Sequence, residues 1–110
     1  MDCGDSVKIM VGTTTYPSKE DAVSAIDLLV RNNLAKCGQI EGPIESHYIW
    51  KGEKQVEMEW RVTLKYSIAN REALEKELLA NHPYDTPQLV VWKGEAEEKY
   101  GSWVNSGPEK

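Results

Sequence analysis

Phenylalanine is absent from this chain of 110 residues, and cysteine and histidine each occur only twice. RNA-recognition sheets stack bases on exposed Phe or Tyr side chains, so the lack of phenylalanine disfavours that class. Cys3 and Cys37 form neither a C-x-x-C pair nor a disulfide framework, and both are expected to be free thiols. The scarce residues therefore exclude a disulfide-stapled domain.

Long apolar runs are also absent. No stretch approaches the roughly 20 apolar residues of a membrane-spanning helix, and residues 1–5 show neither a basic nor an apolar signal region. We expect a cytoplasmic protein without a membrane partner. The net charge is -5, and neither Lys nor Arg gathers into a patch that could replace the counterions of a phosphate backbone. Nucleic acid is therefore not an expected partner.

Signatures of catalysis are missing as well. The sequence contains no G-x-S-x-G elbow, no P-loop and no H-E-x-x-H motif. Acylphosphatases hold phosphate with a glycine-rich loop and an arginine near the first strand, whereas residues 7–17 contain no arginine. We predict a protein that is not an enzyme.

The composition that remains is that of a globular domain, with 40% hydrophobic and 28% charged residues in a chain of single-domain size. We expect one domain over residues 7–105, a disordered tail over 1–6 and a polar tail over 106–110. Apolar spacing and capping residues predict its elements. They are a strand at 7–11, a helix from Ser18 to about Asn33, a strand at 34–50 bent at Gly42-Pro43, a strand at 56–66, a helix from Asn70 to His82, a strand at 88–92 and a helix from Ala96 to Val104.

The clearest pattern is the strict alternation over residues 56–66, which predicts a strand with two distinct faces. Apolar side chains are expected to face the helices, and polar ones the other side of the sheet. The apolar set is Val56, Met58, Trp60, Val62, Leu64 and Tyr66; the polar set is Glu57, Glu59, Arg61, Thr63 and Lys65. The polar face is either solvated, or partly buried between subunits, where its charges would pair or bind a polar ligand.

The element order is βαββαβ with an extra C-terminal helix, which predicts an α+β protein with a ferredoxin-like sandwich and both main helices on one face of the sheet. An eleven-residue strand at ~3.3 Å per residue is roughly 36 Å long, against a radius of gyration of about 13 to 14 Å for a domain of this size. The hairpin formed by residues 34–66 should therefore extend beyond its own domain. Its unpaired backbone groups predict association with other copies.

Several segments resemble the CutA divalent-ion tolerance family over residues 7–105. They are LAKC at 34–37, SHYIWKGE at 46–53, Glu59 with Lys65, HPYDTP at 82–87, and Tyr100 with Trp103. The resemblance implies a homotrimer that pairs through its long hairpins and has a shape similar to the P-II signalling proteins. It also implies a role in tolerance of divalent metals, copper above all. We expect Cu(II) or another divalent cation to be bound weakly, and no organic cofactor.

His82 is the candidate metal ligand, since imidazole at a helix end can bind copper or zinc. The alternative is a structural histidine that bonds backbone groups at the end of the helix. In family members with proposed copper ligands, these are a cysteine ending the first strand and tandem histidines before the proline; here Thr14 and Asn81 occupy those places. One imidazole does not hold a transition metal tightly, because closed sites need three or four ligands.

The resemblance also places a ligand cleft between subunits. Its candidate residues are Glu59, Lys65, His82, Tyr84, Tyr48 and Trp50. The aromatic members are most economically explained as core or interface residues. Two functions follow: a trimeric, non-catalytic metal-tolerance protein, or a P-II-like signalling or scaffold module whose clefts bind a small anion, a metabolite or a protein partner.

Overall fold

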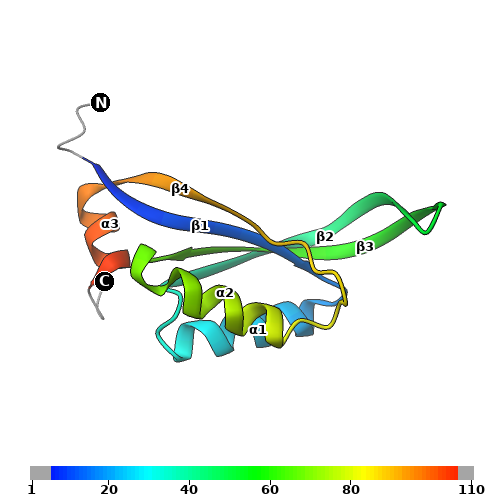
Figure 1. Cartoon of the computed structure of the whole chain (residues 1–110), viewed down its shortest axis with the longest axis horizontal. Helices are drawn as coiled ribbons and strands as arrows, with labels where there is room; N and C mark the ends of the chain where they lie inside the picture. The colour runs from blue at the N-terminus through cyan, green and yellow to red at the C-terminus, as the bar shows by residue number, and fades with distance from the viewer. Residues whose placement is uncertain (1–5, 107–110) are drawn as a thin grey trace.

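The computed structural model describes residues 6–106 (Figure 1). The order of elements is the one expected, with a short 3-10 turn, η2, added before the second helix. The elements are β1 (Ser6–Tyr16), α1 (Lys19–Arg31), β2 (Cys37–Trp50), β3 (Glu53–Tyr66), η2 (Ile68–Asn70), α2 (Arg71–Ala80), β4 (Val90–Glu97) and α3 (Glu98–Asn105).

The four strands form one antiparallel sheet in the order β2-β3-β1-β4. The two strands joined by the hairpin, β2 and β3, thus lie to one side, and β1 sits between β3 and β4. This is the strand order of a ferredoxin-like sandwich, so the predicted α+β fold is confirmed. A register shift interrupts the β2–β3 ladder between Glu41 and Ile44, where Gly42-Pro43 was expected to cause a bulge.

Three strands are longer than the apolar runs indicated, and β3 begins at Glu53 rather than Val56. β1 continues to Tyr16 rather than ending at Val11, because the three threonines are β-branched and pair along β3. β4 begins at Val90 and continues to Glu97, beyond the expected 88–92. Ala96, expected in the last helix, instead pairs with Val7 on β1, and the helix starts at Glu98.

The main core lies between the sheet and the α1–α2 layer, as expected. Ser18 caps α1 by accepting a hydrogen bond from the Asp21 backbone N–H at 3.0 Å. Asn70 occupies the N-cap position of α2, but its side chain donates instead to the Asn33 and Leu34 carbonyls. The buried cluster is Met10, Tyr16, Ala22, Leu29, Ala35, Val62, Leu64, Tyr66, Leu74 and Leu78.

The last helix, α3, packs against β1 and β4 at the end of the sheet far from the hairpin tip (Figure 1). Val7 and Ile9 alternate with Met10 along β1, so they point away from the main core. A Cβ added to Gly101 would lie 2.6 Å from the Val7 Cβ, too close for any larger residue there. The end of the second face is therefore closed by α3, while the rest of it remains open.

The β2–β3 hairpin extends well beyond the helices (Figure 1), and the molecule measures 48 × 30 × 23 Å. β1 pairs with β3 only from Trp60 onward, so residues 53–59 have a strand neighbour on one side only, which is β2. We call the two-stranded part, residues 44–50 and 53–59, the ribbon. Val56 and Met58, expected to face the core, are half exposed because the helices end before they reach the ribbon.

The predicted tails fall mostly outside the described residues. Within residues 6–106, Ser6 is the first residue of β1, and Ser106 is the C-cap of α3. No helix in this part of the chain has the length and apolar character needed to cross a membrane.

Candidate functional site

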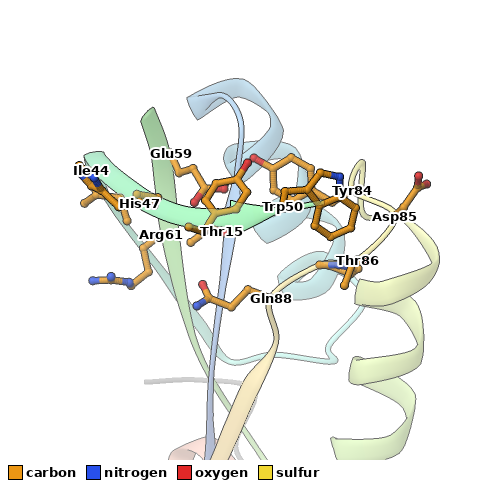
Figure 2. A pocket seen from close by; sticks show the side chains of 13 residues that line it. Thr15, Ile44, His47, Trp50, Glu59, Arg61, Tyr84, Asp85, Thr86 and Gln88 are labelled. Carbon is orange, nitrogen blue, oxygen red and sulfur yellow. The ribbon is translucent and has the colours of Figure 1, made fainter. Parts of the chain in front are cut away.

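A pocket of about 610 Å³ lies where β1 ends and the ribbon begins (Figure 2). Its floor is the open face of β2 and β3, and the loop that follows α2 forms one wall. The lining residues are Thr15, Ile44, Ser46, His47, Tyr48, Trp50, Glu59, Arg61, Tyr84, Asp85, Thr86, Pro87 and Gln88. Four of the six cleft candidates are therefore brought together: Glu59, Tyr84, Tyr48 and Trp50.

Glu59 is the most buried charged residue of the pocket, with only 8% of its surface exposed. Its strand face was expected to be either solvated or partly buried between subunits; Glu59 is instead buried within its own chain, where Tyr84 from the loop after α2 contacts it. The Tyr84 hydroxyl donates a hydrogen bond to Glu59 Oε2 at 2.8 Å. Burial and this carboxylate together raise the pKa of Tyr84, so the phenol stays protonated and acts as the donor.

Tyr48 and Trp50 reach the pocket from the ribbon. Ile44 pairs with Glu59 across the ribbon and Tyr48 pairs with Gln55, so both strands place these alternate residues on one face. The Tyr48 hydroxyl donates to Glu57 Oε1. Both rings are large and partly exposed, at 38% for Tyr48 and 48% for Trp50. The pocket thus offers aromatic surface beside a buried carboxylate.

The cation of the pocket, Arg61, stands on its other side. Its Nη1 lies 3.2 Å from Glu41 Oε1, and this ion pair compensates its charge. Figure 2 shows the guanidinium extending away from Trp50 and Tyr84, with the Gln88 amide between the two groups. The aromatic side of the pocket therefore carries the negative charge of Glu59.

His82 lies behind the pocket rather than in its lining. Its ring stacks on Tyr16, with centroids 4.4 Å apart, and faces Tyr84 at 5.3 Å. The Tyr84 backbone N–H donates to His82 Nδ1 at 3.2 Å, so the proton of the neutral ring is on Nε2, which bonds Thr14 Oγ1 at 3.1 Å. Both ring nitrogens are thus engaged in holding the loop that carries Tyr84.

We expect this arrangement to make stability pH-dependent. Burial lowers the pKa of His82 below its ordinary 6.5, although the Thr15 backbone, Glu59 and Asp21 act in the opposite direction. Between about pH 6.5 and this lower folded-state pKa, the unfolded chain binds more protons, so the free energy of unfolding falls as the pH drops through that window. Urea unfolding of wild type and His82→Gln from about pH 7.5 to 5 measures this, and parallel profiles would contradict it.

Lys65 is separated from the other candidates. It lies six residues from Glu59 on β3, roughly 20 Å along the strand, and its Nζ donates to Gln39 Oε1 at 2.6 Å. The lining residues that sequence reasoning did not assign to the pocket are Thr15, Ile44, Ser46, His47, Arg61, Gln88 and the Asp85–Pro87 segment. The HPYDTP motif contains three of them, but only the fold shows that its loop crosses the base of the ribbon.

Metal-binding groups do not gather in the described part of the chain. Among residues 6–106, no three side chains of His, Cys, Asp or Glu come close enough to share an ion. Thr14 is fully buried and bonds His82, and the Asn81 amide donates to the Glu77 carbonyl. The other histidine, His47, is exposed on the ribbon, where its Nε2 lies 2.6 Å from Glu45 Oε2.

The fold and the pocket define a small ferredoxin-like α+β protein with a projecting ribbon and an aromatic pocket at the base of that ribbon. The sequence profile of the family described as CutA1 divalent ion tolerance protein matches residues 10–107. This chain belongs to that family, as the resemblance implied. Its general association is with tolerance of divalent cations.

Relatives and solved structures agree with this assignment. The divalent-cation tolerance protein CutA of Escherichia coli (strain K12 / DH10B) is 30% identical over 93 residues, covering 84% of this chain and 83% of the relative. The divalent ion tolerance protein CutA1 of Ehrlichia chaffeensis superposes with a TM-score of 0.84 at 32% identity, covering 87% of this chain and 91% of that one. CutA1 of Oryza sativa gives 0.83 at 30% identity, covering 91% and 93%.

Proposed function

We propose that this protein acts as a non-catalytic homotrimer in tolerance of divalent metal ions, copper among them. Membership of the CutA1 family supports the role in tolerance. The single structural observation that carries the assembly is the ribbon, whose residues 53–59 pair with β2 alone. Backbone groups left open along such an edge are normally covered or paired with another chain.

The side chains of the ribbon support the same assembly. Both of its faces carry apolar residues that solvent reaches in the single chain. These are Tyr48 at 38%, Ile49 at 64%, Trp50 at 48%, Val56 at 52% and Met58 at 50% exposure. Apolar patches of this kind mark interaction surfaces. Packing of the ribbon against neighbouring copies would remove Ile49, Val56 and Met58 from water, whereas Tyr48 and Trp50 line the pocket.

We further propose that copper is bound weakly. His82 is the candidate ligand, yet an ion would have to displace the Tyr84 N–H from Nδ1 or Thr14 from Nε2. The hydroxyl of Thr14 and the amide of Asn81 replace the softer donors that copper prefers. These contacts support an occasional imidazole–metal bond rather than a closed site.

Three measurements on the same tag-free protein test the proposal. Light scattering after size exclusion should give the mass of three chains. Calorimetry with Cu(II) should show weak heat that disappears in His82→Ala but persists in His47→Ala, which removes the exposed histidine. The chain should also restore growth on copper to a bacterial strain that lacks its own CutA. A stable monomer at micromolar concentration, or no restored growth, would refute it.

A second candidate function rests on the pocket. We infer a P-II-like module in which the pocket, at the base of the ribbon, binds a small anion, a metabolite or part of a protein partner. The supporting observation is the meeting of Glu59, Tyr84, Tyr48 and Trp50 in one pocket of about 610 Å³. This volume falls in the range usual for small-molecule sites.

A further inference from the structure

Glu59 is a buried acid with incomplete compensation. It is 92% removed from solvent, since 8% of its surface is exposed, yet its hydrogen-bond partner in the described chain is one neutral phenol, Tyr84. None of the ion pairs among residues 6–106 involves Glu59. A buried carboxylate is costly unless it is paired and hydrogen-bonded. The cation of the pocket, Arg61, pairs with Glu41 rather than with Glu59, so Glu59 would stabilise a positively charged ligand.

The same pocket offers three aromatic rings on its Glu59 side. Tyr48 and Trp50 come from the ribbon. Tyr84 comes from the loop after α2, and Figure 2 shows it on the same side of the pocket as Trp50. The faces of tryptophan and tyrosine rings attract cations, and clusters of such rings beside an acid are the usual receptors for alkylated ammonium groups. The hydroxyls of Tyr48 and Tyr84 are turned toward Glu57 and Glu59, so they are already used as donors.

We propose that this pocket binds an organic ammonium ion, with Glu59 as its counter-charge and Trp50, Tyr48 and Tyr84 around its alkyl groups. The inference rests on the second candidate function and names its ligand class. Charge on the Glu59 side selects against a small anion. Arg61 lies on the far side of the pocket, where it pairs with Glu41 at 3.2 Å.

Two other occupants fit the site less well. A bare divalent metal ion needs several oxygen or nitrogen donors, and within residues 6–106 no group of three or more His, Cys, Asp or Glu side chains could hold one. A neutral apolar ligand would complete the burial of Glu59 without supplying a charge. An alkylammonium group satisfies both the rings and the acid.

Calorimetry and NMR with tetramethylammonium chloride test the inference, with tert-butanol as a neutral ligand of similar size and sodium chloride as the ionic control. We expect saturable binding of the ammonium ion alone, with a shift of the Trp50 indole N–H among the four tryptophan signals. Trp50→Leu, which identifies that signal, should weaken binding about 10-fold by removing the ring face. Glu59→Gln keeps the shape and an acceptor for Tyr84 but should weaken binding at least as much.

Glu72→Gln, an exposed acid on α2, makes the same change of charge away from the pocket and should bind as wild type does. Equal responses to tetramethylammonium and tert-butanol, or unchanged binding in Glu59→Gln, would overturn the inference. So would a trimer that restores copper tolerance but shows no Trp50 shift at millimolar tetramethylammonium; that result would leave the proposed tolerance function intact. A monomer that lacks metal tolerance but still binds the ammonium ion would refute the proposed tolerance function and support the ammonium inference.

Discussion

Replacing Val62 with aspartate is expected to abolish folding. Val62 is 1% exposed and lies in the cluster between the sheet and the α1–α2 layer. Loss of its buried surface costs about 1.5 to 3 kcal/mol, and an unpaired carboxylate in the same place costs several kcal/mol more. The sum approaches the entire stability of a typical domain, about 5 to 15 kcal/mol. Circular dichroism and the soluble yield of Val62→Asp measure the outcome.

Val23 provides the matched control for this experiment. It lies on α1 with 45% of its surface exposed, so Val23→Asp makes the same chemical change where water can solvate the charge. We expect Val23→Asp to fold and to keep the wild-type oligomeric mass, with a change in stability of about 0.5 kcal/mol or less. A folded Val62→Asp protein would show that the sheet does not bury its inner face as described.

Replacing Val56 with aspartate should give a folded chain that no longer forms the proposed trimer. Val56 is 52% exposed on the ribbon, opposite His47, and none of the helices covers it. The charge is therefore tolerated in the single chain but would be desolvated wherever another copy packs on the ribbon. Light scattering should report a monomer, while circular dichroism remains like that of wild type.

Comparison with Val23→Asp separates a specific effect on the ribbon from a general effect of added charge. If Val56→Asp remains trimeric at low micromolar concentration, this face of the ribbon does not lie in the interface. Assembly would then have to use its other face, where Tyr48 and Trp50 are exposed.

The order of the elements was predictable because the sequence states it locally. The alternation over residues 56–66 predicts a strand, and the apolar spacing after Ser18 predicts a helix. Neither prediction needs information from another element. The strand ends were not predictable in this way. In the sequence, Thr13 to Thr15 resemble a loop, because only the structure shows that they pair with β3. Gly94 has no side chain that would mark β4 as a strand.

The candidate site was predictable only in part, for the same reason. Tyr48, Trp50 and Glu59 share a face through the period of two along the ribbon, which sequence reasoning can follow. The position of Tyr84 over Glu59 depends on where the loop after α2 crosses the sheet, and that is a tertiary fact. Lys65 lies on the same strand as Glu59, but six residues of strand span roughly 20 Å, which is too far for both side chains to line one pocket.

The position of α3 limits how copies of this chain can associate. One face of the sheet lies under α1 and α2, and α3 covers the far end of the other, so apart from the ribbon, whose two faces are both exposed, the described chain has one bare stretch of sheet. When neighbouring copies pack on this bare stretch, they cover it and leave no second bare stretch of sheet for further copies. Growth by this route is self-terminating, which favours a closed particle of fixed size over a fibre.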